Sequence, residues 1–166
     1  MRTLLSTVLV FFVILTLPVP AAFALEKGEA APGFTLPALD GGKVSLASLR
    51  GRVVVLDLAT TWCPSCRQQM EELEALRDFF RQNDVAVLQV FLQDTEEMVR
   101  EHVDGRGHPD FFVHLLDDGS VRRAYNVYLI PRLLVLDREL NVVRDGSLMT
   151  ADAMRRLIES LPRGGQ

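Results

Sequence analysis

The sequence has very few cysteines and no excess of positive charge. Its 166 residues include two cysteines, and 18 Lys and Arg against 22 Asp and Glu give a formal net charge of −4. Two cysteines exclude a disulfide-dense scaffold and a four-cysteine zinc site. The mildly acidic balance lacks the positive charge that is the usual electrostatic footprint of a nucleic-acid-binding protein. There is no internal repeat, low-complexity tract or interdomain linker, so this length indicates one domain.

The beginning of the chain has the composition of an export signal. No charge occurs between Arg2 and Glu26, and an apolar core covers residues 4–17. Small residues precede a cleavage point after Ala24, as in secretory signals. The charge-free run, residues 3–25, is also long enough to serve as an uncleaved membrane anchor, which needs roughly 20 apolar residues. Both alternatives place the rest of the chain outside the cytoplasm.

We therefore expect residues 1–24 to be a signal peptide or an N-terminal membrane anchor, and residues 25–166 to form one domain. The expected location is the periplasm or the outer face of the cytoplasmic membrane. In such a compartment a pair of cysteines is oxidised unless another protein reduces it, so redox chemistry is available to this chain.

After an irregular segment at 26–43, apolar runs predict alternating strands and helices. Buried strands are expected at 52–58, 85–91 and 111–116, and helices at 64–82, 120–125 and after Thr150. A further helix is expected to begin at Asp94, with Glu97 completing a capping box. Residues 133–136 and 140–144 predict a hairpin. This order predicts a mixed sheet with helices on both faces.

The two cysteines lie in Trp62-Cys63-Pro64-Ser65-Cys66, where the first buried strand ends and the long helix begins. Cysteines three residues apart in a first helical turn are within disulfide reach. The helix N-terminus favours a thiolate at Cys63, which predicts Cys63 as the attacking sulfur and Cys66 as the resolving thiol. Pro64 suits the first helical position.

Two other interpretations of the pair remain open, a permanent structural disulfide and two ligands of a metal site. A bridge that closes so short a loop would contribute little stability. A metal would need further donors, and His102, His108 and His114 have no ligand spacing to one another.

Asp57 and Ile130-Pro131 are the other candidate site residues. Asp57 lies in an otherwise apolar strand, where burial should raise its pKa and make it a proton acceptor for Cys66. Alternatively, it is an aspartate bonded to backbone at a strand end. Pro131 opens a strand, and X-Pro bonds are where cis peptides occur. On local sequence alone a trans proline in an edge strand is the better interpretation.

These features together resemble the thioredoxin superfamily, specifically the exported TlpA/ResA/CcmG-type thiol–disulfide oxidoreductases. The resemblance covers about residues 28–160 and rests on four segments: 31–37, 46–51, 62–67 and 125–131. It implies an α/β, thioredoxin-like fold with a mixed central sheet flanked by helices, an N-terminal extension and an inserted segment near 93–118. It also implies Cys63 as nucleophile, Cys66 as resolver and Pro131 as a cis-proline facing them.

Several positions depart from the family pattern. Asp57 stands where TlpA-like members usually have Asn, Ala59 where Trp is usual, and Gln69 where Glu is common. Arg132 follows Pro131 in place of the usual Thr and is expected to add a cation near the site. Residues assigned to partner binding are Trp62, Pro64, Ile130 and Arg132.

The expected activity is reduction of disulfides in exported partner proteins, and apocytochrome c is one candidate substrate. A membrane-bound or exported electron donor is expected to supply the electrons. We expect no cofactor. Two alternative functions are a thiol peroxidase and a copper-binding assembly factor of the Sco type. Thr60 lies three residues before Cys63, as in thiol peroxidases, but Leu56 stands where that motif has Pro. A Sco-like copper-binding assembly factor needs one more residue between its cysteines, and a distal His.

Overall fold

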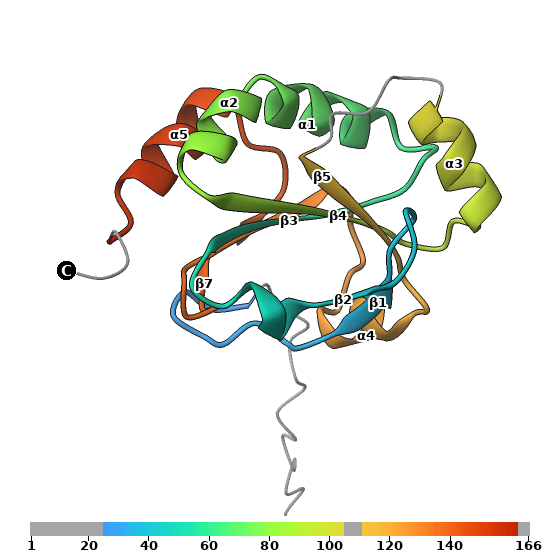
Figure 1. Ribbon diagram of the computed structural model, residues 1–166, viewed down its shortest axis with the longest axis horizontal. Helices are drawn as coiled ribbons and strands as arrows, with labels where there is room; N and C mark the ends of the chain where they lie inside the picture. Colours follow the sequence, from blue (N-terminus) through green and yellow to red (C-terminus); the bar gives the residue numbers. More distant parts are fainter. Residues whose placement is uncertain (1–24, 105–110, 163–166) are drawn as a thin grey trace, which may run out of the picture.

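The computed structural model describes residues 25–104 and 111–162, which form a five-stranded mixed sheet covered on both faces (Figure 1). The strand order is β5 (Phe112–Leu116), β4 (Val85–Phe91), β3 (Val53–Ala59), β6 (Arg132–Leu136) and β7 (Val142–Gly146). The first three are parallel to one another, whereas β6 runs antiparallel to β3 and β7 antiparallel to β6. The predicted mixed sheet and C-terminal hairpin are confirmed.

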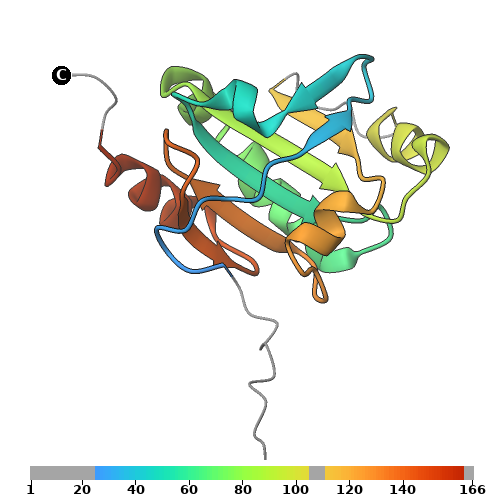
Figure 2. The ribbon, with the colours of Figure 1, turned by 90° about the horizontal axis from the view of Figure 1, so that it is seen from below.

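Helices and a small hairpin cover the two faces. One face is covered by α1 (Pro64–Glu74), α2 (Arg77–Gln82) and α5 (Ala151–Glu159). The other lies against the hairpin of β1 (Thr35–Pro37) and β2 (Lys43–Ser45), the 3-10 helix η1 (Leu46–Leu49) and α4 (Ser120–Ala124), as Figure 2 shows from below. Helix α3 (Glu96–Asp104) lies beyond one end of the sheet and packs on Leu39 and Phe91.

The central strands are buried on both faces because their side chains alternate between two cores. In β3, Val53 and Val55 face the α1 side, whereas Val54, Leu56 and Leu58 face the α4 side. Strands β3 and β4 each have seven residues, six of them apolar, and both strands are fully buried, as expected for parallel strands between two covered faces.

The helix expected over 64–82 is wrong in one respect, because it is broken between α1 and α2. At Leu76 the backbone leaves the helical region, with φ −102° and ψ 9°, and its N–H donates to Leu73 three residues back. After the break both Phe79 and Phe80 are buried. The two rings are neighbours within α2 and both belong to the core on the α1 side of the sheet.

Two other local expectations are also corrected. The cap of α3 is Thr95, whose Oγ1 accepts the N–H of Met98 at 3.2 Å; Asp94 is turned to another partner. The segment 26–43 is less irregular than expected, because β1 pairs with β2 across the turn at Gly41 and Gly42, both with positive φ.

The segment expected as an insertion, 93–118, provides α3 and the edge strand β5 on either side of residues 105–110. The expected signal segment 1–24, and His108, lie outside the described residues. Within residues 25–104 and 111–162, no helix is long and apolar enough to span a membrane.

Candidate active site

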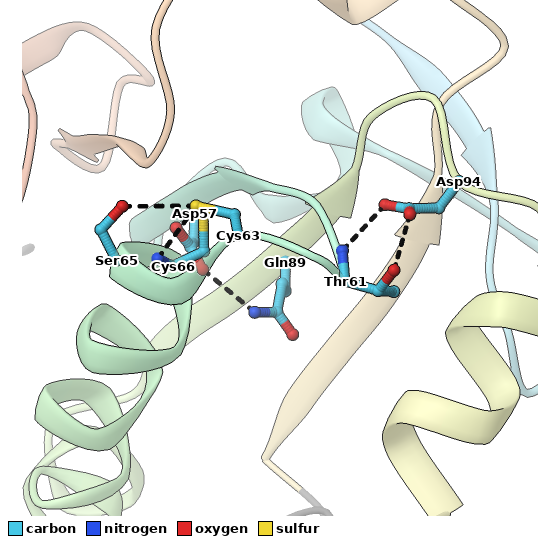
Figure 3. The surroundings of a disulfide bond; sticks show 7 residues. All are labelled: Asp57, Thr61, Cys63, Ser65, Cys66, Gln89 and Asp94. Atoms are coloured by element: carbon cyan, nitrogen blue, oxygen red, sulfur yellow. Dashed lines mark hydrogen bonds between the residues drawn. A yellow bond between two sulfur atoms is a disulfide. The ribbon is translucent and has the colours of Figure 1, made fainter.

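Cys63 and Cys66 form a disulfide at the start of α1, directly beyond the end of β3 (Figure 3). Their Cα atoms are 5.2 Å apart. The two residues are 4% and 3% exposed, and they pack with Ala59 and Ile130 in one small apolar cluster. The pair is therefore covered by protein, and a partner must approach it from the side of the exposed residues around it.

Cys63 is the N-cap of α1. Its Sγ accepts a hydrogen bond from the backbone N–H of Cys66 at 3.1 Å, and it lies 3.4 Å from the hydroxyl of Ser65. Pro64 occupies the first helical turn, where a missing N–H leaves no carbonyl unpaired. The position of Cys63 at the positive end of the helix dipole is one that stabilises a thiolate once the disulfide is reduced.

Asp57 lies on the α1 side of β3 and is paired with Gln89 in β4. The two residues are opposite one another in the parallel register, and Gln89 Nε2 donates to Asp57 Oδ2 at 3.1 Å. Asp57 is 0% exposed. Burial raises its pKa to about 7, against a smaller lowering by the Gln89 hydrogen bond. This carboxyl group can therefore gain or lose a proton near neutral pH.

Each member of this pair retains an oxygen with no partner. Asp57 Oδ1 and Gln89 Oε1 are buried and accept no hydrogen bond from any described residue. Gln89 was missed by sequence reasoning. The signal was present, since Gln89 is the one polar residue in Val85–Phe91, as Asp57 is in Val53–Ala59. Parallel pairing of the two strands brings these residues together.

The loops that follow β3 and β4 are tied to one another beside the disulfide. The carboxylate of Asp94 accepts the backbone N–H of Thr61 at 3.1 Å and its hydroxyl at 2.8 Å (Figure 3). Because Thr61 is two residues before Cys63, this contact fixes the approach of the chain to the cysteine motif. The sequence indicated Asp94 only as a helix cap.

The expected partner-binding residues Trp62, Pro64 and Ile130 surround the disulfide. Trp62 is 63% exposed, Pro64 is exposed, and half-buried Ile130 contacts the cysteine cluster. The Ile130-Pro131 peptide bond is cis. The chain therefore reaches the disulfide from two directions, the end of β3 and the start of β6.

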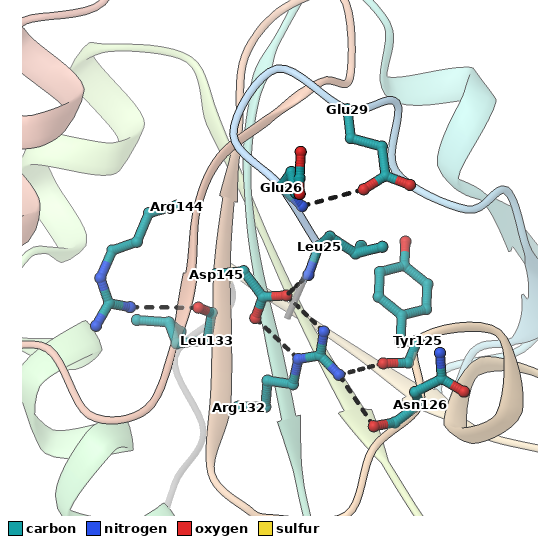
Figure 4. Close-up of polar contacts among 9 residues, drawn as sticks. All are labelled: Leu25, Glu26, Glu29, Tyr125, Asn126, Arg132, Leu133, Arg144 and Asp145. Atoms are coloured by element: carbon teal, nitrogen blue, oxygen red, sulfur yellow. Dashed lines mark hydrogen bonds and ion pairs between the residues drawn. The ribbon is translucent and has the colours of Figure 1, made fainter. Parts of the chain in front are cut away.

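Arg132 is not brought to this surface, which corrects the expectation of an added cation at the site. Its guanidinium lies on the α4 side of the sheet, where Nε donates to Asp145 Oδ1 at 2.8 Å (Figure 4). Nη1 donates to the carbonyl oxygens of Tyr125 and Asn126. Asp145 also accepts the backbone N–H of Leu25 at 2.7 Å. Arg132 therefore holds the loop that leads to Pro131.

That loop carries two exposed apolar residues which sequence reasoning missed. Tyr128 is 74% exposed and Leu129 is 84% exposed. They directly precede Ile130, which contacts the cysteines. Trp62 is likewise exposed and directly precedes Cys63, and we call these three residues the exposed apolar border of the site.

The residues behind the alternative functions are placed as follows. The side chain of Thr60 is buried and its hydroxyl has no hydrogen-bond partner in the described part of the chain. The rings of His102 and His114 each pack against Phe91. No group of three or more metal-ligating side chains occurs within residues 25–104 and 111–162.

Comparisons with known proteins agree on one family. Residues 26–149 match the family described as Redoxin. The thioredoxin-like protein YneN of Bacillus subtilis (strain 168) is 33% identical over 123 residues, which cover 73% of this chain and 71% of that protein. The thiol-disulfide oxidoreductase ResA of Geobacillus kaustophilus (strain HTA426) is 28% identical over 140 residues, 83% of this chain and 79% of ResA.

A solved structure described as the thiol:disulfide interchange protein DsbE from Chlorobium tepidum superposes with a TM-score of 0.73 at 28% sequence identity. The superposition covers 82% of this chain and 98% of that one. The expected thioredoxin-like fold is therefore confirmed by sequence and by structure.

Proposed function

The chain belongs to the redoxin family, as a thiol–disulfide oxidoreductase of the TlpA/ResA/CcmG type within the thioredoxin superfamily, and we propose that it is an exported reductase of disulfides in partner proteins. The observation that carries the proposal is the placement of Cys63 as N-cap of α1 with buried Asp57 on the same side of the sheet. The domain is residues 25–166, preceded by a signal peptide or anchor at 1–24.

In the first step the reduced protein attacks a partner disulfide through Cys63. A bond forms between Cys63 Sγ and one partner sulfur, the partner S–S bond breaks, and the other partner sulfur leaves as a thiolate. The N–H of Cys66 and the helix dipole stabilise the Cys63 thiolate before the attack.

In the second step Cys66 resolves the mixed disulfide. Cys66 Sγ bonds to Cys63 Sγ, the Cys63–partner bond breaks, and the second partner sulfur leaves. Two electrons have then passed from the dithiol to the partner. The proton of the Cys66 thiol goes to Asp57, whose pKa near 7 lets it accept that proton and then release it to solvent.

Partner binding is assigned to Trp62, Pro64 and Ile130. Trp62 and Pro64 are exposed next to the cysteines in the chain, and half-buried Ile130 contacts the cysteine cluster from the start of β6, so an extended partner segment can bind along these residues. The backbone of Ile130, next to cis-Pro131, offers its N–H and C=O to such a segment. Arg132 is assigned to holding this loop, because its guanidinium is bound to Asp145.

The reductase direction is inferred from Asp57 and from Ile130 before Pro131, which resemble reducing members of the family. Location outside the cytoplasm is inferred from residues 1–24. The substrate class is a disulfide-containing exported protein, with apocytochrome c as one candidate, and the electron donor is a membrane-bound or exported protein.

The test is a pair of cysteine variants in an insulin-reduction assay. Cys63→Ser should abolish turnover, whereas Cys66→Ser should accumulate a partner-linked disulfide that dithiothreitol releases. Ser65→Ala, which keeps both thiols, serves as the matched control for a change within the motif. Retained activity in Cys63→Ser would overturn the proposal.

The direction is tested by redox titration against glutathione. A reductase requires a reduction potential below about −200 mV, whereas strong oxidants lie near −120 mV. A value at the oxidising end would leave the dithiol mechanism intact and overturn the assignment as a reductase.

A further inference from the structure

A basic pocket lies beside the loop that leads to the disulfide. It has a volume of about 370 Å³, and the residues that line it are Gly119, Arg122, Arg123, Asn126, Val127 and Tyr128. Arg122 and Arg123, two consecutive residues of α4, therefore line one hollow. This is a local concentration of positive charge on a chain whose formal net charge is −4.

The charges in this pocket are only partly neutralised. The Arg123 guanidinium lies against Gly119, where an added Cβ would be 2.8 Å from Arg123 Nη1. The pKa of Asp118 is lowered mainly by hydrogen bonds from Ser120 and to a smaller extent by the charge of Arg123. Arg122 forms no side-chain hydrogen bond or ion pair with any residue in 25–104 or 111–162. At least one guanidinium is thus available to an incoming anion.

A short stretch of chain connects the pocket to the disulfide cluster. Tyr128 lines it, and Tyr128 is two residues from Ile130, which contacts the disulfide cluster. Two residues span at most about 7 Å of chain. An extended segment bound along this loop at the cysteines therefore passes the mouth of the pocket within a few residues of its own reacting cysteine.

The lining suits one kind of group. Guanidinium groups bind carboxylates with planar, bidentate geometry, and the Asn126 amide and Tyr128 hydroxyl can add hydrogen bonds. The ring of Tyr128 offers apolar surface to the methylene groups of an acidic side chain. A lysine or arginine of a partner would meet like charge there.

We propose that this pocket is a recognition subsite that accepts an aspartate or glutamate side chain of the partner protein, a few residues from the cysteine under attack. The inference rests on the proposed reduction of partner disulfides and adds a preference among partners. The exposed apolar border of Trp62, Tyr128 and Leu129 contacts the residues between that acid and the cysteine.

The test uses a panel of disulfide-bonded peptides in which one glutamate is moved over four positions on each side of a cysteine, each with a glutamine counterpart. The rate constant of reduction by the reduced protein is measured for both. At one position the wild-type protein should reduce the glutamate peptide about fivefold faster than its glutamine counterpart. Added salt should diminish this ratio of the two rate constants.

The ratio should fall to about one in Arg122→Gln/Arg123→Gln. Arg156→Gln is the matched control, because Arg156 is exposed on α5, which covers the opposite face of the sheet. A ratio near one at every position in the wild-type protein would overturn the subsite, as would a ratio that survives in the double variant or falls equally in the control.

Failure of the underlying function is detected separately. Hydroxyethyl disulfide is small and uncharged, so its reduction depends on the dithiol and does not require the pocket. If the wild-type protein does not reduce it, the proposed reductase function is wrong. If it is reduced while no peptide shows the preference, only the subsite is wrong.

Discussion

Gln89 Nε2 donates a hydrogen bond of 3.1 Å to Asp57 Oδ2 between directly opposed residues of two buried parallel strands. The donor is neutral, so the carboxyl group has one hydrogen bond but no opposite charge to compensate its burial. The consequence is a carboxyl whose pKa is raised to about 7 by desolvation, and which therefore titrates at physiological pH.

Asp57→Asn should remove a pH dependence of stability. Between about pH 4 and pH 7 the folded protein binds a proton at Asp57 that the unfolded chain has lost, so the free energy of unfolding falls as pH rises. Above pH 7 the Asn variant should be more stable by on the order of 4 kcal/mol, and near pH 4 the two should be similar. Urea unfolding of the oxidised proteins at pH 4, 6 and 8 measures this. Equal pH slopes in both would contradict it.

Gln89→Leu should raise the pKa of Asp57 further. The lost hydrogen bond favours the ionised carboxylate, so its removal should move the titration up by about one pH unit. Carbon-13 NMR of the Asp57 carboxyl in the oxidised protein gives the midpoint. Gln82→Leu, at an exposed position of α2, is the control and should leave the midpoint in place. A downward shift in Gln89→Leu would refute the assignment.

Arg132→Met should destabilise the fold by about 3–5 kcal/mol, because it leaves the Asp145 carboxylate, 2% exposed, without its cation. It should also free the carbonyl groups of Tyr125 and Asn126. Urea unfolding at pH 7 measures the loss. The double variant Arg132→Met/Asp145→Asn should recover part of the lost stability, since neither charge of the pair remains buried. If the double variant loses as much stability as the two single variants together, Arg132 and Asp145 are not energetically coupled.

Gln69→Glu should cost about 2 kcal/mol. The buried amide of Gln69 donates to the carbonyl oxygen of Met149 at 3.1 Å and accepts its N–H at 2.7 Å. A carboxylate of the same size can make only the second bond and carries a buried charge. Gln68→Glu, the exposed neighbour, is the control and should change stability by less than about 0.5 kcal/mol. Equal effects of the two substitutions in thermal or urea unfolding would contradict this role.

The strands and the reactive pair were predictable because their signals are local. A run such as Val53–Ala59 is apolar except for Asp57, and such runs are typical of central strands buried on both faces. Cys63 and Cys66 are three residues apart at a strand–helix junction, so their proximity follows from helix geometry alone. The order of these elements indicated the mixed sheet.

The break at Leu76 was not predictable from the same kind of signal. The apolar spacing of Met70, Leu73, Leu76 and Phe80 fits one continuous helix, and no proline or glycine interrupts it. In the folded chain α1 ends at Glu74 and α2 begins at Arg77, and both Phe79 and Phe80 of α2 lie in the core on the α1 side of the sheet. Tertiary packing can override such a local helical preference, and the outcome is set only in the folded chain.

Residue types and their spacing along the chain were enough to specify the strands, the cysteine motif and the family to which the protein belongs. Which polar side chains meet was decided by the fold, because strand register places Gln89 opposite Asp57 and strand pleating turns Arg132 away from the disulfide toward Asp145. The physical reason is range: hydrophobic periodicity acts over a few residues, whereas hydrogen bonds and ion pairs between distant segments exist only once the sheet has brought them within about 3 Å.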